Sequence, residues 1–225
     1  MIMKILGFDM EVDISNENTN LLVVTDNKLF GSICCNLNDK NSDNIVFVSN
    51  DSLINMKDIL IVFDLLNFNI NNKTIINKLY NHLSDNIISN IDEENELKDN
   101  FMKMVRIVYD EIDDFNVDIS LNEELDLIKL FKMLNVEINT DYDGVLERMI
   151  DLLEIYSELN DQTIIFINIL SYFSDEEIIE IQKYINYKKL SVLFFENSYN
   201  RGVYFENQYI IDDDFYDYAI QFDKK

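Results

Sequence analysis

The chain has 225 residues, 48% of them hydrophobic and 12% aromatic, which is enough for a sizeable core and unlike a disordered chain. Its net charge of −25 disfavours unassisted contact with phosphates or anionic lipid, and suits cations, basic partners or nucleic-acid mimicry. Cys34 and Cys35 are neighbours that do not suit a disulfide, and no apolar run approaches the roughly 20 residues that cross a bilayer. We therefore expect a reduced, soluble, cytoplasmic protein with no membrane contact.

Several short apolar runs predict β-strands. They are LLVVTD from Leu21, IVFVS from Ile45, ILIVFDL from Ile59, TIIFINIL from Thr163 and LSVLFFE from Leu190. The last three are continuous rather than alternating, which is typical of strands buried on both faces of a sheet. Helices usually cover both faces of such a sheet, so the fold class predicted here is α/β, with a mixed sheet.

Helices are predicted between these strands from apolar spacings of three and four. The first runs from Asp92 to about Phe115, and a capping box at Ser120–Glu123 predicts a second helix that ends near Leu134, with Asn135 as a left-handed cap. A third runs from about Tyr142 to Leu159. A second capping box, Ser174–Glu177, predicts the helix that follows the strand at Thr163.

Three consecutive helices between two strands are too much for one simple crossover. We therefore predict a helical lobe, residues 91–159, that projects from an α/β head made of residues 1–90 and 160–225.

The sequence lacks the motifs of nucleotide hydrolysis, nucleophilic catalysis and zinc binding. The run ILIVFD ends in Asp64 like a magnesium-binding strand, but no G-x-x-x-x-G-K-[ST] loop exists to cradle phosphates, so we reject an ATPase and interpret Asp64 as a strand-end or helix-cap residue. The single histidine, His82, lies in a helical pattern without a nucleophile motif, and two adjacent cysteines with one histidine do not make a closed zinc site. No catalytic residue is therefore predicted. A two-metal nuclease built on acidic residues stays open as a weaker alternative.

The stretch 109–126, YDEIDDFNVDISLNEELD, carries eight carboxylates and no basic residue. Acids on both sides of a helix–connector–helix turn can converge on one hard cation such as calcium, although acidic runs are more often a solvated face. Acids in the first turn of a helix also suit the helix dipole, which is the plainer interpretation of Glu123 and Glu124. The candidate calcium ligands are Asp110, Asp114, Asp118, Glu123, Glu124 and Asp126.

Basic residues are few and gather in three places, which alone would not indicate nucleic acid. They are Lys98, Lys103 and Arg106 on the first predicted helix, Lys129 and Lys132 on the second, and Lys183, Lys188 and Lys189 around YINYKK.

Several segments, in this order and spacing, together resemble the accessory spacer-acquisition protein of type II-A CRISPR systems. They are residues 59–79, 125–138, 146–159, 163–197 and 209–215, of which IQKYINYKKLSVLFFE is the most specific. The resemblance covers residues 59–215 well and the first 58 only loosely, through LLVVTDNKLF. Where relatives tend to have Gly, this chain has Asn67 and Asn135, which also tolerate a left-handed turn.

The resemblance implies a non-enzymatic protein that forms a homotetrameric ring around double-stranded DNA, loads at free ends and needs calcium for assembly. It implies a head like that of ring ATPases without a nucleotide site, a helical leg, and action with the CRISPR integrase and effector nuclease. It also makes Asp118, Glu123, Glu124 and Asp126 the preferred calcium ligands, with Asp110 and Asp114 behind them.

A tetramer would carry a charge of about −100 while it surrounds a polyanion, so the expectation is that the lysines line the hole and the acids face outward. We expect contacts to backbone phosphates that weaken steeply with salt, without base readout. The main alternative is an acidic DNA mimic that occupies a basic protein's nucleic-acid site, without a tetramer or a calcium effect.

Overall fold

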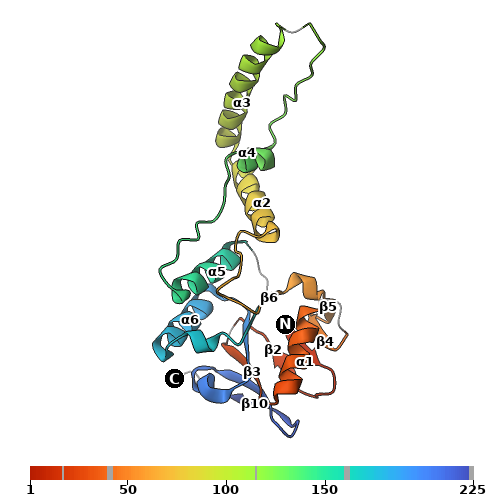
Figure 1. Ribbon diagram of the computed structural model, residues 1–225, viewed down its shortest axis with the longest axis vertical. Helices are drawn as coiled ribbons and strands as arrows, with labels where there is room; N and C mark the ends of the chain where they lie inside the picture. Colours follow the sequence, from red (N-terminus) through yellow and green to blue (C-terminus); the bar gives the residue numbers. More distant parts are fainter. Residues whose placement is uncertain (17, 40–42, 115, 160–162, 223–225) are drawn as a thin grey trace. The chain divides into compact units, whose positions relative to one another are not determined.

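The computed structural model describes residues 1–16, 18–39, 43–114, 116–159 and 163–222 (Figure 1). The chain forms two compact units. Met1–Phe68 and Thr140–Lys225 make up the head unit, and Asn69–Asn139 make up the helical unit. The mixed α/β head with a helical lobe agrees with the predicted fold class.

A six-stranded sheet forms the centre of the head unit, with the order β10-β9-β3-β8-β7-β6. Strands β3, β6, β7, β8 and β9 run parallel to their neighbours, and only β10 is antiparallel, to β9. Their bounds are β3 Asn20–Val24, β6 Leu60–Val62, β7 Ile164–Ile167, β8 Val192–Glu196, β9 Asn207–Ile211 and β10 Asp217–Gln221. Strands β3, β7, β8 and β9 are buried along their whole length, as their continuous apolar runs predict for a covered sheet.

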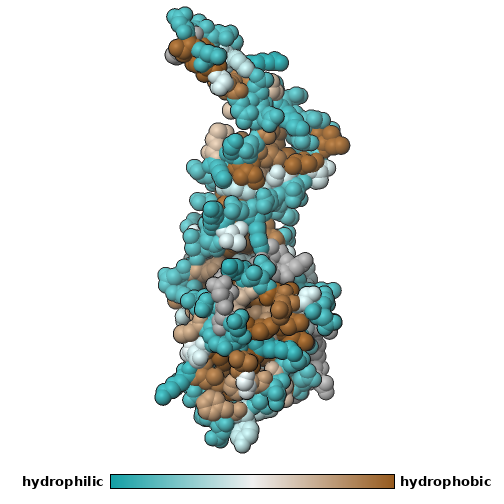
Figure 2. Space-filling view, turned by 90° about the vertical axis from the view of Figure 1, so that its right-hand side faces the viewer, coloured by the Kyte–Doolittle hydropathy of each residue, from teal (hydrophilic) through white to brown (hydrophobic). Residues whose placement is uncertain are grey.

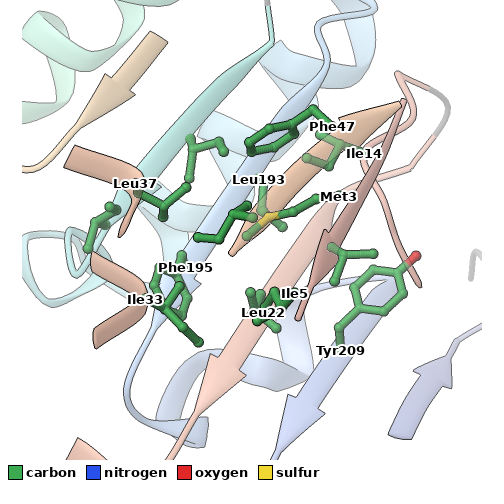
Figure 3. Close-up of a cluster of buried hydrophobic side chains, with 14 of the residues drawn as sticks. Met3, Ile5, Ile14, Leu22, Ile33, Leu37, Phe47, Leu193, Phe195 and Tyr209 are labelled. Carbon is green, nitrogen blue, oxygen red and sulfur yellow. The ribbon is translucent and has the colours of Figure 1, made fainter. Parts of the chain in front are cut away.

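A smaller antiparallel sheet and one helix cover one face of this sheet. The small sheet has the order β2-β1-β4-β5, and the helix is α1. Their bounds are β1 Ile2–Ile5, β2 Glu11–Asp13, α1 Asn27–Asn38, β4 Ile45–Ser49 and β5 Ser52–Ile54. Figure 3 shows Met3, Phe47 and Leu193 meeting in the core between the two sheets. Phe30 of α1 packs on Phe195 with 4.6 Å between ring centroids.

Two helices lie on the opposite side of the large sheet, α5 (Val145–Leu159) and α6 (Asp175–Lys188) (Figure 1). Phe166 and Phe194 stack at 5.6 Å, and the ring of Phe205 meets Phe194 edge-on at 5.3 Å. The described part of the head also contains the 3-10 helices η1 Met56–Asp58, η2 Leu170–Tyr172 and η3 Tyr199–Tyr204. Strands β3, β7, β8 and β9 are therefore covered on both faces, while β10 stays mostly exposed.

The helical unit consists of α2 (Lys73–Ser89), α3 (Ile91–Ile112) and α4 (Leu127–Met133). Its core is centred on two aromatic residues. Tyr80 of α2 packs on Phe131 of α4, with 5.6 Å between ring centroids, and its hydroxyl donates a hydrogen bond to the carbonyl of Val136. Of α3, only Val105 is buried. Long α3 therefore depends on few tertiary contacts. In the part of the chain that the structure describes, no helix is long and apolar enough to cross a membrane.

The predicted strands are present, but the helices differ in three ways. Among the described residues, four α-helices rather than three lie between β6 and β7, since α2 precedes α3. Helix α3 is described from Ile91 to Ile112, and Phe115 lies outside the described residues. The compact units also divide the chain differently from the predicted boundaries, since α2 belongs to the helical unit and α5 to the head. Helix α5 joins the head because it packs against α6.

The capping box predicted at Ser120–Glu123 is wrong, and α4 begins only at Leu127. Local polar bonds compete with it: Asn122 accepts a bond from the Glu124 amide, and the Glu123 carboxylate accepts the hydroxyl of Tyr109. The capping box at Ser174 is confirmed, with reciprocal bonds to Glu177 of 3.3 and 2.7 Å.

The two asparagines at relatives' glycine positions behave differently. Asn135 is left-handed, with φ of +50°, as predicted. Asn67 does not have a positive φ, because its amide and side chain instead donate to the carboxylate of Asp64.

Candidate functional site

The acidic stretch lies at the end of α3 and in the segment 116–126 that leads to α4. Asp110 belongs to α3 and Asp114 to the turn after it, while Asp118, Glu123 and Glu124 lie in the non-helical segment. All of these carboxylates are exposed, and Asp126 is half-buried at the start of α4. Solvent therefore reaches nearly every charge of the stretch.

Glu123 is bonded to α3. The hydroxyl of Tyr109 donates to its carboxylate, and this bond raises the pKa of the Tyr109 hydroxyl, because the neighbouring negative charge resists loss of the proton. The bond spans fourteen residues and holds segment 116–126 against the helix. One of the expected calcium ligands thus already has a structural partner.

Asp126 is the N-cap of α4. It accepts the Lys129 amide at 3.0 Å and lies 3.2 Å from the Lys129 ammonium. The backbone bond from Lys129, followed by its side chain, lowers the pKa of Asp126. A carboxylate held in this way stabilises the helix start, which is its plainer role.

The structure does not bring the expected ligands together. Within the described ranges, no three His, Cys, Asp or Glu residues lie close enough to share a metal ion. Calcium takes six to eight oxygen ligands, so the described residues do not form a ready-made calcium site. The same finding leaves the described residues without the preformed carboxylate cluster of a two-metal nuclease.

A cavity of about 280 Å³ lies between α3, segment 122–126 and α4. Its walls are largely apolar, from Phe101, Met104 and Met133, with Glu124 and Asp126 at the segment side. Met104 and Met133 are 54% and 63% exposed. Figure 2 shows hydrophobic residues at the surface of the helical unit among hydrophilic ones. Such exposed apolar side chains suit a protein–protein contact.

The basic residues of α3 do not form a separate stripe. At 100° per residue, Lys98, Lys103 and Arg106 fall within an arc of about 140°, which Asp99 and Asp110 share. Lys98 also pairs with Glu94, and the Lys103 ammonium donates to Asn100. On α4, Lys129 pairs with Asp126, and Lys132 is exposed. The helical unit thus has a mixed surface rather than a purely basic one.

The remaining basic candidates are Lys183 and Lys188 of α6 in the head and Lys189, the residue that caps this helix. Lys183 and Lys189 are exposed, and Lys189 is left-handed, with φ of +53°. Lys188 lies 2.8 Å from Glu154 and 4.0 Å from Glu158 of α5, and its hydrogen bond to Glu154 raises its pKa. Lys188 therefore joins α6 to α5, and its charge is largely matched.

A second cavity, of about 470 Å³, lies in the head where β7 and β8 end. Polar groups line it, among them Asn168, Ser198 and Glu196, whose carboxyl accepts the Leu170 amide at 3.1 Å. Burial raises the pKa of Glu196 to about 7. Sequence analysis did not single out Glu196, although an acid that ends the apolar run LSVLFFE is a visible signal.

Other reactive side chains show no catalytic arrangement. His82 is exposed on α2, and Asp64 forms a turn with Asn67 after β6. Burial, followed by the adjacent Cys35, raises the pKa of the Cys34 thiol to about 11, so this thiol stays protonated at neutral pH.

A family model described as "CRISPR-associated protein (Cas_Csn2)" matches residues 37–215. The chain belongs to the Csn2 family of CRISPR-associated proteins. It is 24% identical over 205 residues to the CRISPR-associated protein Csn2 of Streptococcus agalactiae, covering 88% of this chain and 90% of that one. It is 26% identical over 163 residues to Csn2 of Enterococcus faecalis, covering 71% of each.

The fold is also similar to the crystal structure of Stu0660 of Streptococcus thermophilus. The TM-score is 0.62 at 12% identity, with 99% of this chain and 76% of that chain covered. This likeness supports the α/β head with a helical lobe, and the resemblance seen in the sequence is confirmed at the level of the family.

Proposed function

We propose that this Csn2-family chain takes part in CRISPR spacer acquisition as a non-enzymatic protein that binds double-stranded DNA at its ends. In this proposal four copies form a calcium-stabilised ring around the duplex and act with the CRISPR integrase and effector nuclease. Membership of the Csn2 family is the observation that carries the proposal.

The exposed apolar residues of α3 support assembly into an oligomer. Met104, Ile107 and Val108 are 54%, 66% and 43% exposed, and Val105 is the one residue of α3 that is buried. A 22-residue helix that buries so little of itself gains stability when another copy covers it. An oligomer supplies such a cover.

The charge of the chain sets a condition on DNA binding. Phosphate contacts must come from exposed cations, of which Lys103, Arg106, Lys132, Lys183 and Lys189 are the best placed candidates. Because acids lie among them, the attraction is weak and screened, and binding falls steeply with salt. Phosphates look alike in every sequence, so no base preference is expected.

Calcium enters the proposal through the carboxylates of segment 116–126. Since no three of them converge in the described part of the chain, calcium would either draw this segment together or take ligands from two copies. In the first case calcium binding would order segment 116–126, and in the second it would favour association of the copies. Glu123 and Glu124 are the residues to test, because both line the same shallow cavity beside α3.

The decisive experiment compares linear duplex DNA with a covalently closed circle of the same sequence, each with calcium and with chelator. Retention of the linear form alone, and only with calcium, is the result expected of a ring that threads onto ends. Equal binding to both forms would contradict the ring. Absence of binding in every condition would favour the acidic DNA mimic, and cleavage with magnesium or manganese would favour a nuclease.

A double variant, Glu123→Ala with Glu124→Ala, tests the calcium site. The matched control is Glu176→Ala with Glu180→Ala, which removes two exposed carboxylates from α6 of the head. We expect only the first pair to weaken calcium-dependent assembly and DNA retention. Unchanged native mass and DNA binding in the first pair would show that these carboxylates are a solvated face.

A further inference from the structure

Strand β10 is an open edge of the six-stranded sheet (Figure 1). It pairs with β9 on one side, and within the described residues no strand pairs with its other side. Its sequence, DYAIQ, contains no proline or lysine, the residues that usually protect such edges from pairing with another chain. The edge is therefore open to a further strand.

The direction of the backbone groups of β10 follows from its ends. The carbonyl of Tyr216 accepts the Asp212 amide at 3.0 Å, and the amide of Phe222 donates to the carbonyl of Glu206 at 2.8 Å. Even-numbered residues thus bond inward, toward β9. Because bonding directions alternate along an antiparallel strand, Asp217, Ala219 and Gln221 present their amides and carbonyls outward.

The even-numbered side chains of β10, Tyr218 and Ile220, and those of its flanking residues, Tyr216 and Phe222, are largely apolar and exposed. Tyr216 is 70% exposed, Tyr218 42%, Ile220 36% and Phe222 52%. They share one face of the strand, since successive side chains alternate. Tyr199 of η3, 41% exposed, lies beside this face, with its hydroxyl 3.5 Å from that of Tyr218.

We propose that β10 pairs antiparallel with β10 of a second copy of the chain, about a two-fold axis at Ala219. This register uses every outward group and forms about six backbone hydrogen bonds, through Ala219 opposite Ala219 and Asp217 opposite Gln221. The six-stranded sheets of the two copies then form one continuous sheet. The even-numbered residues then form non-hydrogen-bonded pairs, where side chains lie closest.

The resulting side-chain pairs are self-complementary. Tyr218 faces Ile220 of the second copy, and Tyr216 faces Phe222, so each two-fold contact holds two of each apolar pair. Asp217 faces the amide of Gln221 rather than a second acid, and its carboxylate already accepts the Met10 amide at 2.6 Å. No like charges oppose each other within β10.

Charge and area favour a second copy as the occupant. Two chains of −25 repel each other, so they can meet only where acids are sparse, and β10 holds a single carboxylate, that of Asp217. The acidic triplet Asp212–Asp214 precedes the strand, and antiparallel pairing places the two triplets about 30 Å apart, beyond the Debye length of about 10 Å. The five part-exposed side chains of this face contribute roughly 100 Å² each, so the ten of two copies would bury about 1,000 Å², which is the lower limit for a specific interface.

A charge swap tests the register. Ile220→Glu places a carboxylate against Tyr218 of the other copy, twice per contact, and we expect it to raise the dissociation constant at least tenfold. Adding Tyr218→Lys to the same chain sets opposite charges face to face and should restore association to within about threefold. Sedimentation equilibrium and native mass spectrometry, in chelator and without DNA, measure the effect. Leu53→Glu, on the exposed edge strand β5, is the matched control.

A backbone variant gives a second test. Ala219→Pro removes an outward amide without touching a bond to β9, so the fold should persist, by circular dichroism, while association weakens. Wild-type protein that stays monomeric, or variants that associate as the wild type does, would overturn the proposal, and failure of the charge swap to restore association would overturn the register.

This contact deepens the proposed tetramer, as one of its two-fold interfaces, yet its test involves neither calcium nor DNA. If the proposed function fails, the β10 variants still lower association. If the β10 contact fails, DNA retention by the wild type is untouched. The two outcomes are therefore distinguishable.

Discussion

Glu196 gives the sharpest test of how the head is built. The carboxyl ends β8, is 8% exposed and accepts the Leu170 amide at 3.1 Å. Desolvation raises its pKa from 4.5 to about 7, and the backbone bonds from Leu170 and Ile169 oppose this only in part. The folded protein therefore keeps a proton that the unfolded chain has lost between these pH values.

The sign follows from the raised pKa. Below pH 4.5 the carboxyl is protonated in both states and costs nothing, and above pH 7 it is ionised in both, so its cost to folding is complete. Stability is thus lost as pH rises. Replacement by Gln keeps a neutral acceptor for the Leu170 amide at all pH values. We expect Glu196→Gln to stabilise the protein by about 1 kcal/mol at pH 5 and by about 3 kcal/mol at pH 8.5.

Urea unfolding of the wild type and Glu196→Gln between pH 5 and 8.5 measures this difference, and the repulsion among the other carboxylates largely cancels in it. At pH 8.5 the melting temperature should rise by about 6–12 °C for a chain of this size. Glu180→Gln, exposed on α6, removes one charge without burial and should show a small, flat difference. A pH-independent gain for Glu196→Gln, or a loss that grows with pH, would refute the burial argument.

Three further outcomes are expected. Asn135→Gly should stabilise the helical unit by up to about 1 kcal/mol and Asn135→Ala should destabilise it by about 1–2 kcal/mol, because φ is +50°; urea unfolding that ranks Ala above Gly would contradict this. Ser174→Ala should cost about 1 kcal/mol and Ser174→Gly only a few tenths, since the capping box starts α6; equal losses on thermal unfolding would exclude a capping effect. Lys188→Gln should weaken DNA retention less than Lys183→Gln, because Glu154 and Glu158 already match the charge of Lys188; the reverse order in a salt titration would place Lys188 on the phosphates.

The buried strands could be predicted from the sequence because each is a continuous apolar run. Strands β7 and β8 can be predicted without knowing which strands they pair with, since burial on both faces demands hydrophobic residues throughout. Strand β10 is the opposite case. Its residues are mostly exposed, and only its pairing with β9 makes it a strand, so no local pattern distinguishes it from a loop.

Helix boundaries depended on bonds that the pattern alone does not reveal. Ser120 and Glu123 have the spacing of a capping box, as do Ser174 and Glu177, but only the second pair forms one. The difference lies in Tyr109, fourteen residues before Glu123, whose hydroxyl takes the carboxylate that the box requires. A distant residue therefore decides a local structure, which periodicity cannot show.

The acidic stretch 109–126 is tolerated for a reason that does not require a cation. The structure spreads its carboxylates over the end of α3 and a non-helical segment, where all but Asp126 face water and Asp126 caps α4. Exposed like charges are screened at physiological salt, so their mutual repulsion costs each unit little. In the proposed ring, a cation would become important where copies approach one another and the carboxylates lose water. In the proposed function calcium would therefore act on the assembly of this chain rather than on its fold, and chelation should open the ring into dimers paired through β10 while it leaves the helices intact.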